Sequence, residues 1–152
     1  MDIRPALHSD LPQIQHLVDL LDVTRQKNFS TSTKLFHQRK EAYPPLAVTD
    51  FEKDIFLVVE DQGHIIAFVR GSISARVPYE LSKLGYIDDL FVVEEQRGKG
   101  MAQQLLKVLM KKFADLGCDH IITHTDQENA VAQQLYESMG MQKVTVEYWK
   151  KL

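Results

Sequence analysis

Cysteine is almost absent from the sequence: Cys118 is the single one in 152 residues. One cysteine cannot form a disulfide within the chain, and this usage is typical of a reducing compartment, so we expect a cytoplasmic protein. Long apolar runs are also lacking, since no stretch approaches the roughly 18 apolar residues that a membrane span needs. Asp2, Arg4, His8 and Asp10 interrupt the start of the chain, so a signal peptide is not expected.

Neither charge of one sign nor a metal-ligand pattern dominates the composition. Lys and Arg number 18 against 21 Asp and Glu, a net charge of −3, which does not favour nucleic acid as a partner. The six histidines show no ligand spacing such as H-x-x-x-H, and we expect no metal. Internal repeats and Gly/Ser linkers are lacking too. With 44% hydrophobic residues, the chain is expected to form a single domain over 1–152.

The N-terminal part is predicted to contain a short extended segment and a helix. The extended segment covers 2–7, and Ser9 or Asp10 can cap the helix that follows. Apolar residues at helical spacing define one face of this helix: Leu11, Ile14, Leu17, Val18 and Leu21. In the polar stretch after it, 31–41 is a candidate second helix.

The middle of the chain changes to strand patterns. Residues 55–60 are apolar and β-branched, 61–64 form a turn, and 65–74 are typical of the return strand. This pattern predicts a β-hairpin. After a further polar stretch, 86–93 is predicted to be another strand.

The second half alternates helices with strands. A long amphipathic helix is predicted between Gly100 and Gly117, a buried strand at 121–125, a helix at 129–139 and an apolar last strand at 144–149. Together with the first half, the order β-α-α-β-β-β-α-β-α-β predicts an α/β or α+β domain around one mixed sheet.

The strongest signal for chemistry lies between strand 86–93 and the long helix, where residues 94–102 read EEQRGKGMA. Two glycines at a strand-to-helix turn give the backbone conformations that let several N–H groups face one point. The helix start adds unpaired N–H groups and the positive end of its dipole, which favours a diphosphate-like anion. Arg97 and Lys99 can add direct charge, or can be solvated surface residues.

Other nucleotide-binding motifs do not match this loop. A P-loop needs G-x-x-x-x-G-K-[ST], and a dinucleotide-binding turn needs a third glycine where this chain has Gln103. A glycine turn that merely enters a helix remains the plain alternative for the loop taken alone.

The loop and a later segment resemble motifs of the GNAT acetyltransferases. Arg97-x-x-Gly100-x-Ala102 matches the family's [RQ]-x-x-G-x-[GA] pyrophosphate signature, and it follows an Ile-x-x-Leu-x-Val strand as in that family. An N-x-x-A-x-x-L-Y-x-x-x-G pattern covers 129–140, with Met141 where the family usually has an aromatic residue. The resemblance implies a mixed sheet of about six to seven strands and about four helices, with a splayed strand pair holding acetyl-CoA.

The resemblance also implies which residues bind the cofactor. In the family, backbone groups of the splayed strand bind pantetheine and polarise the thioester carbonyl, and here these belong to Leu90, Phe91 and Val92. The positions that would bind the pyrophosphate are Arg97, Gly98, Lys99, Gly100, Met101, Ala102 and Gln103. Asn129 corresponds to a further cofactor-binding position, and it can equally be a helix N-cap.

The catalytic roles rest on the same resemblance. Tyr136 corresponds to the family's general acid for the departing thiolate, and a phenol with a pKa of about 10 can serve in that role. The alternative for Tyr136 is a tyrosine packed on the sheet. Similarity to the polyamine branch, which usually has Glu there, favours Asp88 as general base, and Asp88 and Asp89 are expected to point to opposite faces of their strand. His124 is a further candidate base, whereas Cys118 is not expected to be a nucleophile.

The sequence therefore predicts an N-acetyltransferase that moves an acetyl group from acetyl-CoA directly to a primary amine in a ternary complex. The alternatives are an inactive acetyl-CoA-binding sensor or interaction module, and a nucleotide-binding regulator of another fold. The acidic residues Glu80, Asp88 and Asp89 favour a small cationic amine over a protein amine as acceptor. Homodimers are frequent in the family, and the predicted last strand with Tyr148 and Trp149 would suit either the core or a dimer edge.

Overall fold

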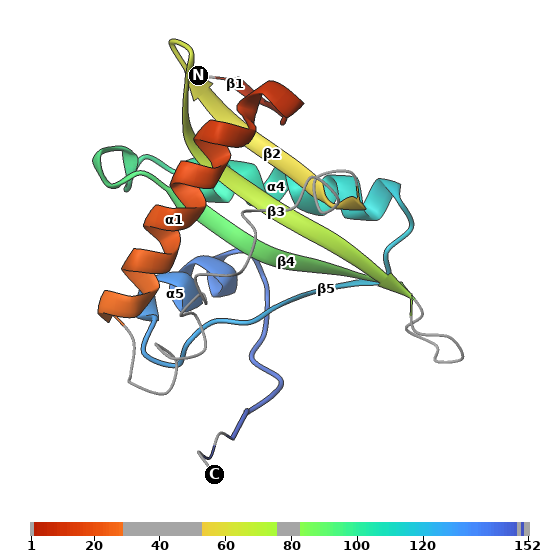
Figure 1. Ribbon diagram of the computed structural model, residues 1–152. Helices are drawn as coiled ribbons and strands as arrows, with labels where there is room; N and C mark the ends of the chain where they lie inside the picture. The colour runs from red at the N-terminus through yellow and green to blue at the C-terminus, as the bar shows by residue number, and fades with distance from the viewer. Residues whose placement is uncertain (1, 29–52, 76–82, 149, 151–152) are drawn as a thin grey trace.

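In the computed structural model, residues 2–28, 53–75, 83–148 and 150 are described, and they form one five-stranded sheet with helices on both faces (Figure 1). The strands are β1 (Asp2–Pro5), β2 (Ile55–Asp61), β3 (His64–Ala75), β4 (Lys83–Val92) and β5 (His120–Thr123), in that order across the sheet. The helices are α1 (Leu11–Asn28), α4 (Met101–Asp115) and α5 (Ala130–Ser138), with short 3-10 turns η1 (His8–Asp10) and η2 (Glu94–Gln96).

The sheet is mixed, as the sequence predicts. Strands β1 to β4 pair antiparallel, and β5 runs parallel to β4. The predicted hairpin is β2–β3, whose turn residues Gln62 and Gly63 have φ values of 50° and 82°. Two positive φ values in succession match the twist of the flanking strands, which is why tight hairpins use such turns.

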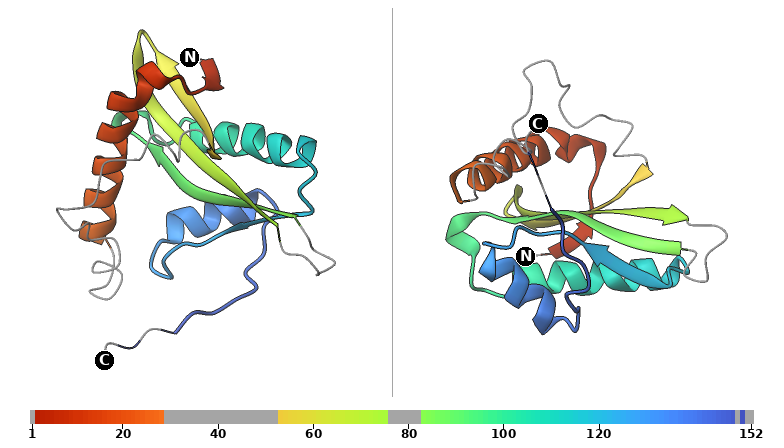
Figure 2. Two further views of the ribbon diagram at one scale, coloured as in Figure 1. Left: turned by 45° about the vertical axis from the view of Figure 1, so that its right-hand side comes forward. Right: turned by 90° about the horizontal axis from the view of Figure 1, so that it is seen from below.

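Helices cover the two faces of the sheet. In the right-hand view of Figure 2, α1 lies on one side of the sheet, and α4 and α5 lie on the other. The α4 side contains a fully buried ring, Phe113, which rests on Gly71 of β3 and Gly85 of β4. A Cβ atom at either glycine would come within 2.6 Å of that ring, so the close contact depends on both glycines.

A charged cluster fixes the start of α1. Asp10 is only 6% exposed, and its carboxylate accepts hydrogen bonds from the Leu7 N–H at 2.7 Å and from Arg4 Nη1 at 2.7 Å. Arg4 also pairs with Glu60 of β2 at 2.6 Å. The hydrogen bond from Arg4 and that from the Leu7 backbone hold the pKa of Asp10 below its usual value, although burial acts the other way.

Two details of the predicted layout change. The predicted strand at 144–149 is wrong as far as residue 148, because 142–148 are extended but pair with no strand within the described residues. Strand β4 begins at Lys83 and not at residue 86, since Lys83 pairs with Ala75 at the far end of β3. The candidate helix at 31–41 lies outside the described residues, and the structure describes five strands where six to seven were expected.

Candidate functional site

The site begins at an irregularity in β4. Arg70 of β3 pairs with Asp89, but the next residue, Gly71, pairs with Ile87, so Asp88 is an extra residue on β4. This is a β-bulge, which bends a strand and changes the direction of its side chains. Ile87, Leu90 and Val92 all pack into the core cluster under α4, although Ile87 and Leu90 are three positions apart and not two.

The bulge places both aspartates on the α1 face of the sheet. Asp89 reaches Arg25 of α1, and Asp88 has a hydrogen bond with Ser72, which lies two residues from Arg70 on the same face of β3. The prediction that the two carboxylates point to opposite faces is therefore wrong. Strict alternation holds only in a regular strand, and here the extra residue cancels it.

Beyond the bulge, β4 loses its neighbour on one side. The pairing of β4 with β5 ends at Ile87 opposite Thr123, whereas β4 continues to Val92. No described strand pairs with this edge of residues 88–92. The two strands therefore diverge, as the predicted splayed pair requires.

The direction of the backbone groups along this open edge follows from one hydrogen bond. The N–H of Val93 donates to Ile66 O of β3 at 3.0 Å. Because N–H directions alternate along a strand, Phe91 also faces β3, whereas Leu90 and Val92 face the open edge. Of the three predicted backbone contacts, two are thus free of the sheet, and the Phe91 N–H lies on the β3 side.

The glycine loop leads from this edge to the start of α4. Gly98 and Gly100 have φ values of 75° and 77°, the left-handed region that glycine adopts without strain. Gly100 is the N-cap of α4, and no side chain caps the helix start that Met101 opens. The first-turn N–H groups of Met101 to Gln103 are therefore left without a side-chain cap, and a Cβ atom at either glycine would meet nothing within 4 Å. An uncapped helix start beside open space is suited to a diphosphate.

The two cations of the loop lie differently. Arg97 turns back along β4, where its Nε donates to Val92 O at 3.0 Å and its guanidinium lies 5.6 Å from the centre of the Phe91 ring. Lys99 is exposed, and its Nζ donates to the Gln96 side chain at 2.7 Å. Arg97 thus places positive charge at the open edge.

Tyr136 and Asn129 lie on α5 and at its start. Asn129 is the N-cap, and its side-chain oxygen accepts from the Ala132 N–H at 3.1 Å, as the N-cap interpretation predicts. Burial raises the pKa of Tyr136 above its ordinary value, while a hydrogen bond with Thr123 and the charge of Arg25 act the other way. The Tyr136 hydroxyl therefore lies beside the end of β5 and stays protonated at neutral pH.

A chain of ion pairs connects α1 with the bulge. Asp89 lies 3.2 Å from Arg25 Nη2 and 3.0 Å from Arg70 Nε, although the latter N–H is not aligned for a hydrogen bond. Arg25 is also 3.8 Å from Asp22, and Arg70 is 3.8 Å from Asp54. The sequence analysis missed these arginines, because no local pattern links residues so far along the chain from Asp89.

Asp88 is the carboxylate that this network leaves aside. Burial raises its pKa above the ordinary value, while the Ser72 hydrogen bond and the charge of Arg70 lower it, and Asp89 raises it. Its Oδ2 atom is buried and has no hydrogen-bond partner within the described residues. A desolvated carboxylate with a raised pKa accepts a proton more readily than an exposed aspartate does.

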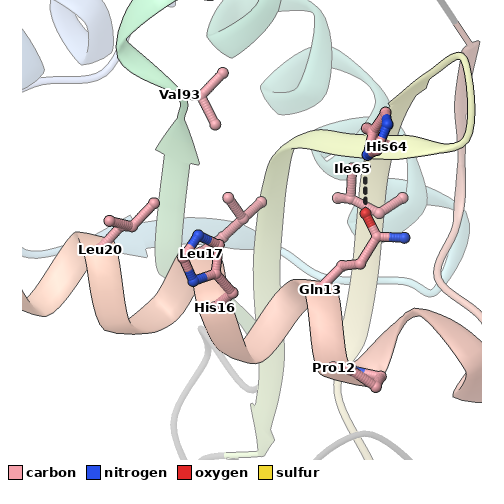
Figure 3. Close-up of a pocket in the computed structure, with 8 residues that line it drawn as sticks. All are labelled: Pro12, Gln13, His16, Leu17, Leu20, His64, Ile65 and Val93. Carbon is pink, nitrogen blue, oxygen red and sulfur yellow. Dashed lines mark hydrogen bonds between the residues drawn. The ribbon is translucent and has the colours of Figure 1, made fainter.

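Of the other two candidates, His124 borders this arrangement and Cys118 lies away from it. His124 is exposed and follows the end of β5, and half-buried Cys118 lies in the turn between α4 and β5. A pocket of about 400 Å³ lies between α1, the β2–β3 turn and Val93, and none of the predicted site residues lines it (Figure 3). Within it Gln13 accepts the Ile65 N–H at 2.9 Å, so this pocket is a feature of the α1–hairpin contact.

Neither a metal cluster nor a membrane helix is found in the part of the chain that the structure describes. No three His, Cys, Asp or Glu residues there lie close enough together to hold a metal ion. None of the described helices combines the length and hydropathy that crossing a bilayer requires.

Comparison with known proteins identifies the fold and the family. Residues 19–141 match the model of the acetyltransferase (GNAT) family. A solved structure of a variant BH1408 protein from Bacillus halodurans has a TM-score of 0.82 at 23% identity, over 100% of this chain and 99% of that one. The aminoglycoside N-acetyltransferase AAC(6')-Iy, solved in complex with CoA, has a TM-score of 0.71 at 19% identity, over 99% of each chain.

Curated relatives match shorter regions. N-alpha-acetyltransferase 30 of Saccharomyces cerevisiae is 41% identical over 56 residues, which are 37% of this chain and 32% of that protein. Mycothiol acetyltransferase of Thermobispora bispora is 26% identical over 97 residues, 64% of this chain and 33% of that protein. The aligned regions thus span about a third of the length of these two relatives.

The family match covers strands β2 to β5 of the mixed sheet, the open β4 edge and the uncapped start of α4. The chain belongs to the acetyltransferase (GNAT) family. The fold class predicted from the sequence is confirmed, with fewer strands than expected in the described residues. The relatives described above do not single out the polyamine branch.

Proposed function

We propose that this protein is an N-acetyltransferase that transfers the acetyl group of acetyl-CoA to a primary amine by direct attack in a ternary complex. One observation carries the proposal: the open β4 edge has the glycine loop at one end and Asp88 and Tyr136 at the other. A cofactor with a diphosphate at one end and a reactive thioester at the other needs this order of groups.

The residues along the edge fit the two parts of acetyl-CoA. The N–H groups of Gly98 to Gln103 would bind the diphosphate, and Arg97 would add charge beside it. Leu90 and Val92 would offer backbone groups to the pantetheine arm, and the Leu90 N–H, which is nearest the bulge, would polarise the acetyl carbonyl. When bound, acetyl-CoA supplies the activated acetyl thioester. Asn129, already engaged as an N-cap, remains a proposed contact from the family resemblance.

Asp88 is the proposed general base. A primary amine is protonated at neutral pH and must lose a proton before its nitrogen can attack. The buried Oδ2 atom has its hydrogen-bonding capacity unused, and the raised pKa brings the carboxylate closer to the amine's range than an exposed aspartate would be. Asp89 is occupied by two guanidinium groups and is a positioning residue.

Tyr136 is the proposed general acid. Its raised pKa keeps the phenol protonated, which an acid that serves a departing thiolate requires. The acid lies on α5, whereas the base lies on β4, at the point where the pairing of β4 with β5 ends. The proposed reaction therefore needs β4 and β5 to stay apart beyond this point.

The proposed acceptor is a small cationic amine, ahead of a protein amine. Support comes from Asp88, whose buried Oδ2 atom has no hydrogen-bond partner within the described residues. A carboxylate in that position attracts an ammonium group. A cytoplasmic location stays a prediction from the single cysteine.

A thiol-release assay tests the function. Acetyl-CoA is offered with polyamines, amino acids, aminoglycosides and short peptides, and acetyl-CoA binding is measured in parallel by calorimetry. We expect micromolar binding and turnover on one class of cationic small amine. Turnover only on peptides would replace the proposed acceptor. Binding without turnover on any amine would favour an acetyl-CoA sensor, and absence of binding would refute the role given to the glycine loop.

A further inference from the structure

Arg97 lies at the start of the glycine loop that joins β4 to α4 (Figure 1), and its side chain folds back over the end of β4. Its Nε donates to Val92 O at 3.0 Å, and its guanidinium lies 5.6 Å from the centre of the Phe91 ring. The carbonyl and the ring are both neutral, so neither of them cancels the positive charge. An exposed guanidinium held in this way keeps a strong attraction for an anion.

The carbonyl that Arg97 occupies belongs to the open edge of β4. In an antiparallel pair, the N–H and the C=O of one residue point to the same side of the strand. The Val93 N–H donates to Ile66 O of β3, so both backbone groups of the preceding residue, Val92, point away from β3. The Arg97 side chain therefore reaches Val92 O from the open edge. A pantetheine arm that lies along this edge needs the same space beside Val92.

The same arginine also borders the proposed diphosphate site. It directly precedes Gly98, and Gly100 is the N-cap of the α4 start that no side chain caps. Exposed side chains change rotamer within nanoseconds, so the contact with Val92 O is readily exchanged. A hydrogen bond from a guanidinium to a phosphate oxygen is stronger than one to a neutral carbonyl. Arg97 therefore has two competing partners: the Val92 carbonyl and an anion at the start of α4.

We propose that Arg97 determines cofactor specificity by closing the open edge at Val92 until a diphosphate draws its side chain away. The inference rests on the proposed function, since it takes acetyl-CoA as the molecule that lies along this edge. Acetyl-CoA has a diphosphate that releases the edge for its own pantetheine arm. A thioester of pantetheine alone has no diphosphate and must displace Arg97 at the cost of a hydrogen bond. The protein therefore selects against such thioesters by more than the missing diphosphate contacts.

The first test offers the two parts of the cofactor separately, as S-acetylpantetheine and inorganic pyrophosphate, with no amine present. In the wild type, saturating pyrophosphate should lower the Kd for S-acetylpantetheine about fivefold, because the edge is freed of one charge-assisted hydrogen bond. In Arg97→Ala this Kd should be about fivefold lower from the start, and pyrophosphate should not lower it further. NMR titration measures all four values.

The matched control is Lys99→Ala, which removes an exposed cation from the same loop. Lys99 binds the Gln96 side chain and not β4, so this variant should keep the wild-type effect of pyrophosphate on S-acetylpantetheine. An Arg97→Ala variant that binds S-acetylpantetheine no more tightly than the wild type would overturn the proposal. So would an effect of pyrophosphate that is the same with and without Arg97.

The second test observes the arginine itself. The Nε–H signal of Arg97, assigned by its loss in Arg97→Ala, is shielded by the Phe91 ring current while the side chain lies over that ring. Pyrophosphate and acetyl-CoA should both shift this signal in the same direction, and a signal that stays in place when pyrophosphate is bound would overturn the proposal. Binding of acetyl-CoA without coupling between its two parts would refute this inference and leave the proposed function intact. Absence of acetyl-CoA binding would refute both.

Discussion

The part of the molecule up to Phe113 and the part after it differ in how they are packed. Among the described residues, all 20 buried apolar side chains lie between Ile14 and Phe113, and all of them except Leu84 belong to two clusters on either face of β2, β3 and β4. From residue 114 to 148 no described residue is buried, although this region contains Leu135, Tyr136 and Met139. The first part has a complete hydrophobic core and serves as the scaffold. The apolar side chains of the second part are only partly buried and pack against that core from outside.

The two parts therefore hold different groups of the proposed site. The scaffold holds the bulge, Asp88 and the open β4 edge in a fixed geometry, which is what a reacting group needs. The second part carries Tyr136, and none of its described residues is fully buried. Regions that bind ligands are commonly the less stable parts of a fold.

The largest effect is expected from opening the scaffold core. Phe113→Ala removes a fully buried ring that rests on two glycines, and we expect a loss of about 4 kcal/mol in the free energy of unfolding. Leu135→Ala, a half-buried position on α5, should cost about 1 kcal/mol. Urea unfolding measures both. Equal losses would show that the second part is as tightly packed as the first.

The next effect concerns Tyr136, the proposed general acid, which lies in the less packed part. Tyr136→Phe should lower kcat about 100-fold, because the general acid is lost, while the Kd for acetyl-CoA changes by less than about twofold. Steady-state kinetics and calorimetry give the two values. Tyr148→Phe removes an exposed hydroxyl and serves as control. A Tyr136→Phe variant with the wild-type kcat would leave Tyr136 as a packing residue.

Much of this scaffold could be predicted from the sequence, because its signals are local. The β2–β3 hairpin, the positive φ of Gly98 and Gly100, and the N-cap at Asn129 all follow from residue type and spacing. The bulge was also visible, since Ile87 and Leu90 are three positions apart, where a regular strand would place residues of one face two apart. A regular alternation ignores the extra residue, and it therefore predicts the wrong face of the strand for one of the two aspartates.

The rest of the site could not be predicted from local sequence patterns. Asp89 meets Arg25 and Arg70 only after α1 and β3 have packed against β4. The segment with Val144 and Val146 does have the strand period, but a strand forms only where an edge receives it, and its own chain places it away from β5. Sequence period therefore indicates the capacity to pair and leaves the partner unspecified.

A smaller effect is expected at the junction between the two parts, the loop before α4. Gly100→Val forces a β-branched residue into φ 77°, which should raise the KM for acetyl-CoA about tenfold by moving the N–H groups of the helix start. The new side chain meets open space, so strain and not a clash is the cause. Gly63→Val, at φ 82° in the β2–β3 turn, has the same strain far from the site. Its KM should not change, and a rise in both variants would point to a general loss of folding.

The smallest effect separates the two parts by pH. The pKa of Asp10 is lowered in the folded scaffold, so its stabilising contribution is present above the unfolded value of about 4 and is lost as pH falls through the folded value. Asp10→Asn should cost about 1 kcal/mol at pH 7, since Arg4 keeps Glu60, and the two unfolding curves should converge toward pH 2. Asp115→Asn removes an exposed pair with Lys111 in α4 and should change little at either pH. A difference between Asp10→Asn and wild type that persists undiminished in acid would show that Asp10 acts through its shape and not through its charge.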